Sequence, residues 1–154
     1  KDNIVRHGGF ETVLNVAKDH TTNVAAIGDA CRTLGVLATD DPVVVVPCVE
    51  VLLGKMDDHS ADASVQKNAC NALFEVVDKH KSITDAILKG GGVAKIVRAM
   101  GNHKENGKVV EAACQALGYF FEEKPEATSE FVSGGGITLV VRVMEEHKGD
   151  ADLQ

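Results

Sequence analysis

The sequence predicts an all-α protein whose helical units stack into an α-α superhelix. Three observations support this fold class. A pattern of glycine, apolar and Ala-Cys-x-x-Leu residues recurs along the 154-residue chain every 39 to 44 residues, which is typical of helical solenoids. Aromatic residues make up only 4% of the chain and tryptophan is absent, which disfavours a β-sandwich. The apolar residues also follow helical spacing rather than strict alternation.

The net charge of −7, from 16 Lys and Arg against 23 Asp and Glu, excludes several classes of function. Nucleic-acid binding needs a basic face, so we expect no nucleic-acid partner. The longest apolar run, residues 43–53, contains Pro47 and Glu50 and is shorter than the ~20 residues that cross a bilayer, so we expect no membrane insertion. The first residues lack a secretion-signal pattern. We therefore predict a soluble protein of the cytoplasm, with the nucleus as the alternative.

The repeat is defined by four equivalent positions, separated by 39, 44 and 44 residues: Gly9, Cys48, Gly92 and Gly136. A histidine lies eleven residues after each of them: His20, His59, His103 and His147. A cysteine lies 22 residues after the first three: Cys31, Cys70 and Cys114. The agreement of several registers indicates a true internal repeat.

These positions divide one solenoid segment, residues 1–154, into units of approximately 1–38, 39–80, 81–124 and an incomplete 125–154. Residues one, four, five and eight places after the reference position form an apolar stripe along a helix of medium length. In the third unit these are Val93, Ile96, Val97 and Met100. A longer helix follows, such as 109–121, and a short helix, such as 82–89 or 125–133, leads back to the glycines.

The second unit departs from this pattern. It has Pro47 and Cys48 where the other units have a glycine pair, and it is five residues shorter before that point. The segment 41–46 begins with Asp41 as N-cap and Pro42 at the first helical position, and we expect a first helix too short for two turns. The stack should therefore change its twist between the first and second long helices.

The glycine turn, the apolar helix after it and the Ala-Cys-x-Ala-Leu long helix resemble armadillo repeats, as in β-catenin-like and importin-α-like solenoids. HEAT repeats are the nearest alternative, but they usually lack the glycine turn and the separate short first helix. The resemblance covers essentially the whole chain. It implies a non-catalytic scaffold that binds a protein or peptide partner along the concave groove of its long helices.

The alternative function is a structural or assembly arm of a larger signalling or cytoskeletal protein. The sequence stops where a further long helix should begin, so we expect a piece of a longer chain or assembly, since an unfinished repeat leaves apolar edges uncovered. No acid, base and nucleophile converge in the pattern. We therefore expect neither an enzyme nor a bound cofactor or metal.

Matching the repeats gives the residues that would line the groove. Importin-α-like members carry a tryptophan and, four residues later, an asparagine, which together clamp a basic peptide. The tryptophan positions here are Arg32, Asn71 and Gln115, and the asparagine positions are Val36, Glu75 and Tyr119. No unit keeps the pair, so binding of a nuclear-localisation signal is not supported. The partner-binding candidates are Arg32, Asn71, Glu75, Lys108, Gln115 and Tyr119, and the alternative is that they are solvated surface.

Three other patterns have structural interpretations. Adjacent helices lie roughly 8–10 Å apart, whereas two donor atoms bound to one zinc ion lie within about 4.2 Å of each other. The repeated histidines therefore cannot share an ion. They are interpreted instead as the residues that end the medium helix of each unit. The glycine runs 90–92 and 134–136 lack the P-loop pattern and are interpreted as sharp turns. The three repeated cysteines are interpreted as small core residues. Phe120 and Phe121 should pack near Phe131, leaving Tyr119 toward the groove.

Overall fold

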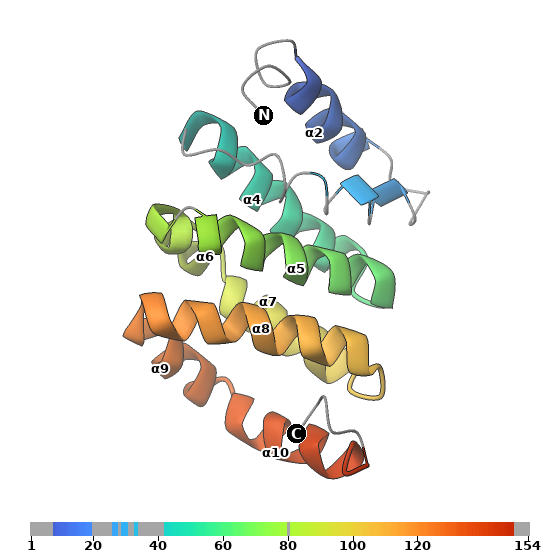
Figure 1. Cartoon of the computed structure of the whole chain (residues 1–154), viewed down its shortest axis with the longest axis vertical. Helices are drawn as coiled ribbons and strands as arrows, with labels where there is room; N and C mark the ends of the chain where they lie inside the picture. The colour runs from blue at the N-terminus through green and yellow to red at the C-terminus, as the bar shows by residue number, and fades with distance from the viewer. Residues whose placement is uncertain are drawn as a thin grey trace.

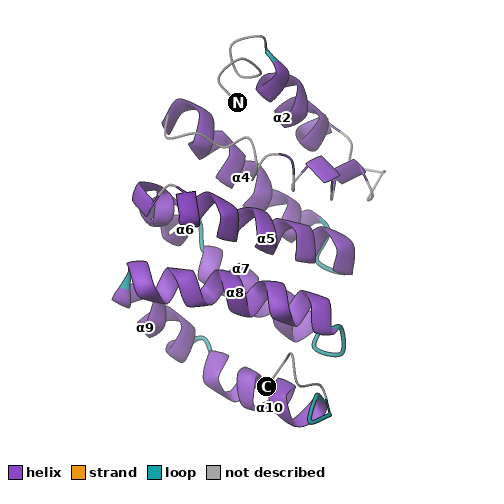
Figure 2. Ribbon diagram, viewed as in Figure 1, coloured by secondary structure: helices purple, strands orange, loops and turns teal. Residues whose placement is uncertain are grey.

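The computed structural model describes residues 8–19, 26–27, 29–30, 33, 42–79 and 81–149. Within these ranges the secondary structure is entirely helical, without a strand (Figure 2). The helices are α2 (Gly9–Asp19), α4 (Pro42–Asp58), α5 (Ala63–Lys79), the short 3₁₀ helix η1 (Lys81–Ile83), α6 (Thr84–Lys89), α7 (Gly92–Asn102), α8 (Gly107–Glu123), α9 (Pro125–Ser133) and α10 (Gly136–Glu146). The predicted all-α class is confirmed.

The helices form a stack that runs from α2 at one end to α10 at the other (Figure 1). The long helices α5 and α8 lie side by side in one layer, with α4 and α7 behind them, and α5 and α8 form the most extensive helix pair. The order short, medium, long is complete in α6, α7 and α8, and it begins again in α9 and α10. Each unit packs mainly on its neighbours, as in a solenoid.

Glycines make the turn between the short and the medium helix in two different ways. Gly91 and Gly135 precede α7 and α10 with φ of +72° and +78°, a conformation that only glycine adopts without strain. Gly92 is needed for space, because a Cβ there would lie 2.3 Å from Ile87 Cγ2 and 2.9 Å from the Ile87 carbonyl oxygen. The structure thus supports the interpretation of the glycine runs as sharp turns.

The second unit corrects our expectation of a separate short helix over residues 41–46. One continuous helix, α4, runs from Pro42 to Asp58 with Pro47 inside it. Pro47 occupies the place of Gly91 and Gly135, and its ring fixes φ near −65°, in the helical region. The turn therefore cannot form and the helix continues. Most of the first long helix lies outside the described residues, so the change in twist stays a prediction.

A continuous apolar core joins the units. One buried cluster extends from α4 through α5, α6, α7, α8 and α9 to Val143 of α10. Leu52, Leu73 and Ile96 are fully buried within it, as the apolar stripe of each helix predicts. A smaller cluster beneath α2 includes Leu14 and Ala17. No unit buries its stripe alone, because each shares the core with the next.

The cysteines only partly follow the prediction of core residues. Cys70 is fully buried, as predicted, and so is Cys48, for which no prediction was made. Burial raises the pKa of each of these two thiols to about 12. Cys31 lies outside the described residues. For Cys114 the prediction is wrong, because this side chain is exposed. The physical reason is that α8 packs over α5, whereas no long helix of the described part packs over the corresponding side of α8.

Two of the repeated histidines each end a medium helix and also link it to the neighbouring unit. His103 and His147 are the C-cap residues of α7 and α10, as predicted. The Nε2 atom of His103 donates to the carbonyl oxygen of Ser60 at 2.9 Å, and that of His147 donates to the carbonyl oxygen of Lys104 at 2.6 Å. In both cases the residue whose carbonyl accepts the hydrogen bond comes directly after the histidine of the preceding unit in the sequence. Each histidine therefore ties its unit to the preceding loop.

Candidate functional site

The polar residues of the two long helices fall on matching lines. Lys67, Asn71 and Glu75 follow one another at intervals of four on α5, and Glu111, Gln115 and Tyr119 do the same on α8, each 44 residues later. Residues four apart lie on one face of a helix. Because α5 and α8 pack side by side, the two lines share one face of the stack.

Between these lines is a shallow depression of about 230 Å³, here called the long-helix groove. Its lining residues are Lys67, Asn71, Lys108, Glu111, Ala112 and Gln115. Of the predicted site residues, Asn71, Lys108 and Gln115 line the groove, Glu75 and Tyr119 lie one helical turn further along the same lines, and Arg32 lies outside the described residues. Lys67 and Glu111 also line the groove but were not predicted from the sequence, although extending each line of residues by one helical turn identifies them.

The groove side chains are available for binding. Within the described part of the chain, Lys67, Asn71, Lys108, Glu111 and Gln115 form no hydrogen bond or ion pair. The two amides can each donate and accept hydrogen bonds, whereas the two ammonium groups only donate. Two cations against one carboxylate make the groove locally positive in a chain of net charge −7.

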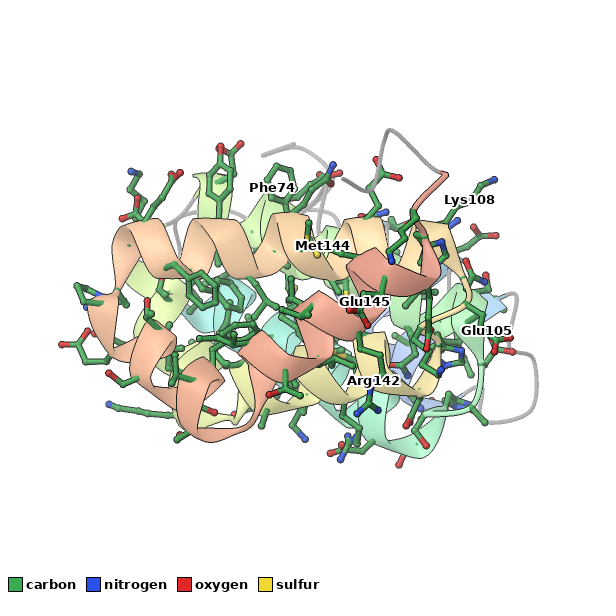
Figure 3. All side chains as sticks on the ribbon, turned by 90° about the horizontal axis from the view of Figure 1, so that it is seen from below. Phe74, Glu105, Lys108, Arg142, Met144 and Glu145 are labelled. Atoms are coloured by element: carbon green, nitrogen blue, oxygen red, sulfur yellow. The ribbon has the colours of Figure 1, made fainter. Side chains whose placement is uncertain are left out.

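Beyond Gln115 the same face ends in an aromatic pair. The rings of Phe74 and Tyr119 meet edge to face with centroids 4.8 Å apart. A hydrogen bond from the Tyr119 hydroxyl to the Asp78 carboxylate raises the pKa of the phenol. In Figure 3, Phe74 and Lys108 project from the same side of the molecule. Repeat matching could not identify Phe74, because its counterpart in α8 is Gly118.

Of the two phenylalanines of α8, Phe121 makes the predicted contact with Phe131. Phe120 is fully buried, and the rings of Phe121 and Phe131 pack edge to face with centroids 5.1 Å apart. These contacts join α8 to α9, and they leave Tyr119 as the aromatic residue of α8 on the groove side.

The side of the stack formed by α4, α7 and α9 has two further hollows. One of about 490 Å³ includes Val49 and Leu53 in its lining, and one of about 450 Å³ includes Val93 and Val97 at the equivalent positions. Asp57 pairs here with both Lys95 and Arg98, and the hydrogen bond from Lys95 holds the pKa of Asp57 below its ordinary value. These ion pairs link α4 to α7.

Two other kinds of site are absent from the described residues. No group of histidine, cysteine, aspartate and glutamate side chains there has the proximity needed to hold a metal ion. No helix in the same ranges combines the length and the apolar composition that crossing a membrane requires.

Stacked units of short, medium and long helices, glycine turns between the first two and a polar groove along the long helices define an armadillo-type (ARM) solenoid. The sequence profile of the LRRK2 ARM repeat matches residues 36–154. The chain therefore belongs to the LRRK2 ARM repeat family. Repeat domains of this type are generally non-catalytic, and membership suggests a protein-interaction scaffold.

A solved structure shows the same architecture. It is the crystal structure of an engineered protein from the Northeast Structural Genomics Consortium, with a TM-score of 0.77 and 25% sequence identity over 98% of this chain. This chain spans 60% of the length of that protein. Comparison with curated proteins gives no match. The boundaries of the four units stay a prediction.

Proposed function

We propose that this chain is a protein-interaction scaffold that holds an extended peptide segment of a partner in the long-helix groove. The observation that carries the proposal is the position of Asn71 and Gln115. They occupy equivalent places on neighbouring long helices and line the same depression. An extended peptide backbone carries a donor and an acceptor at each residue, which is what a side-chain amide pairs with.

The charges of the groove support a ligand of mixed character. Lys67 and Lys108 lie toward the N-terminal ends of α5 and α8, where the helix dipoles are also positive. A carboxylate or another anionic group of the partner fits this end. Glu75 lies one turn toward the other end, where a donor or cation of the partner fits its acceptor-only carboxylate. The proposed ligand is therefore an extended peptide whose acidic end lies beside the two lysines.

The test selects peptides from a random display library on the immobilised chain and measures their affinity by fluorescence anisotropy. The double variant Asn71→Ala, Gln115→Ala removes both amides from the groove. Each lost hydrogen bond is worth about 0.5–1.5 kcal/mol, so affinity should fall about 5- to 150-fold. Helicity and melting temperature should stay unchanged, because neither amide has a partner within the described residues.

Asn102→Ala is the matched control. Asn102 is an exposed amide at the end of α7, away from the groove lining, so its removal should leave peptide affinity unchanged. If the selected peptides bind the double variant as tightly as the unmodified chain, the groove is not the binding surface.

A further inference from the structure

The hollow of about 490 Å³ between α4, α6 and α7, here called the α4–α6 hollow, differs from its repeat equivalent in the residues of its walls. Every residue that lines it lies in the described part of the chain, and helices of two successive units bound it. The hollow therefore does not depend on where the sequence begins or ends.

Apolar side chains of α4 form the floor of the α4–α6 hollow. Val46, Val49 and Leu53 follow one another at intervals of three and four residues, which places them on one face of the helix. Leu53 rests on the turn after α6, because a Cβ at Gly90 would lie 2.5 Å from the Leu53 Cδ1. Val46 joins this wall because α4 continues through Pro47. The floor is thus longer than that of the equivalent hollow, whose lining includes no residue at the place of Val46.

The equivalent hollow one unit later, of about 450 Å³, has longer side chains in its walls. It carries Arg98 at the place of Gly54, and Glu130 at the place of Ala86. An added Cβ at Gly54 would have no atom within 4 Å, so no packing within the described residues requires a glycine there. A glycine inside a helix also destabilises it relative to alanine. The small residues Gly54 and Ala86 therefore leave the apolar floor of the α4–α6 hollow accessible.

The charged residues that line the α4–α6 hollow place carboxylates on α4 and ammonium groups on α6 and α7: Glu50, Asp57, Lys89 and Lys95. Asp57 and Lys95 form an ion pair with each other. Asp85 lies close enough to Lys89 for its pKa to be affected, but its ion pair is with Lys124, 2.8 Å away. Lys89 is therefore the cation of this hollow that can take an anionic group of a ligand.

We propose that the α4–α6 hollow binds a small amphiphilic anion, with an apolar body of one or two rings on the floor of α4 and a carboxylate or sulfonate group beside Lys89. Ligand sites in proteins have volumes of about 300–1,000 Å³, mostly apolar walls and a few polar groups that fix the orientation of the ligand. The α4–α6 hollow has each of these properties. It is separate from the long-helix groove, so the proposal does not rest on peptide binding there.

The test uses anilinonaphthalene sulfonate as the probe, because it combines fused rings with one anionic group and fluoresces strongly in an apolar environment. Titration of the full chain with the probe should give a saturable rise in fluorescence. Naphthoate, which carries a carboxylate on the same rings, should displace the probe. Naphthalene methanol has the same rings without the charge, and it should displace the probe less well.

Substitutions at the mouth of the hollow show whether the probe binds there. Gly54→Leu should weaken probe binding about tenfold or more, because the leucine takes the space of the apolar body, and it should keep the fold because leucine is a better helix former. Ala86→Glu is a second such variant, since it gives α6 the residue of the equivalent hollow. Gly118→Leu is the matched control, because Gly118 lies inside α8 and an added Cβ there also has no atom within 4 Å. It should leave the affinity unchanged.

Two charge variants test the orientation of the ligand. Lys89→Gln should weaken probe binding about two- to fivefold, the range of an exposed ion pair. Glu50→Gln should strengthen it, because a carboxylate that repels the sulfonate is removed. Circular dichroism and the melting temperature of each variant show that the fold is kept.

Three results would overturn the proposal. Absence of saturable binding would show that the hollow takes no such ligand. An affinity that neither Gly54→Leu nor Ala86→Glu changes would place the probe elsewhere on the chain. Equal displacement by naphthoate and naphthalene methanol, with no effect of Lys89→Gln, would refute the anionic class.

Discussion

Replacing Gly92 with alanine tests whether close packing at the α6–α7 turn determines the stacking of the units. The new Cβ would lie 2.3 Å from Ile87 Cγ2 and 2.9 Å from the Ile87 carbonyl oxygen. A rotation of the Ile87 side chain can relieve the first contact. The second contact involves the backbone, so the turn itself has to shift, and with it the packing of α6 on α7.

The expected magnitude follows from two opposing effects. Overpacking of this kind typically lowers the free energy of unfolding by about 1–3 kcal/mol. Replacing a glycine also reduces the conformational entropy of the unfolded chain, which stabilises the folded state by about 0.4–1 kcal/mol. Gly92→Ala should therefore lower the free energy of unfolding by about 1–2 kcal/mol. For a chain of this size the melting temperature should fall by about 2–8 °C.

Gly54→Ala is the matched control, because Gly54 lies inside α4 with no atom within 4 Å of its added Cβ. The same substitution should there raise stability by about 0.5–1 kcal/mol. Urea unfolding followed by circular dichroism measures both variants. If Gly92→Ala proves as stable as the unmodified chain while Gly54→Ala behaves as expected, the close approach of the turn to Ile87 does not constrain the stack.

Three further variants test other parts of the structure. Leu73→Ala should lower the free energy of unfolding by roughly 2–5 kcal/mol in urea titration, through a cavity in the core, and a loss below that range would contradict its full burial. Pro47→Ala should raise the melting temperature, because an interior proline costs a helix up to ~3 kcal/mol; a lower melting temperature would mean that α4 needs its proline. Asp57→Asn should lower stability at neutral pH by less than about 1 kcal/mol, since the ion pairs with Lys95 and Arg98 are partly exposed. The pKa of Asp57 in the folded chain lies below its ordinary value. The stability that its ion pairs contribute is therefore present above the unfolded pKa of about 3.9 and is lost as pH falls through the folded pKa. A stability difference between Asp57→Asn and the unmodified chain that persists at lower pH would refute this contribution.

The helices of the last two units could be predicted well from the sequence, because a single residue near each helix end determines where that helix begins or ends. Pro125 starts α9, and the helix ends at Ser133, the range expected from the pattern. The glycine before α10 forms the turn with its positive φ, which other residues adopt only with strain. These signals depend on single residues and need no knowledge of the neighbouring helices.

Other features depend on packing between units, which a single unit's sequence does not encode. Pro47 is normally a helix-breaking signal, yet α4 passes through it because no glycine provides a turn. Cys70 and Cys114 have nearly the same local sequence, but only Cys70 has a long helix over it. Phe74 joins the candidate site through contact with Tyr119, a pairing that the repeat pattern does not mark.

The histidine bonds have a mechanical consequence for the groove. His103 and His147 fasten successive units at the loops that precede the long helices, so the spacing of units is fixed at that edge. At the opposite end of α8, the hydrogen bond of Tyr119 with Asp78 and the edge-to-face contact of Tyr119 with Phe74 join this helix to α5 of the preceding unit. The pair α5 and α8 is therefore held together at both ends. The groove between them thus keeps its width at the lysine end and at the aromatic end alike.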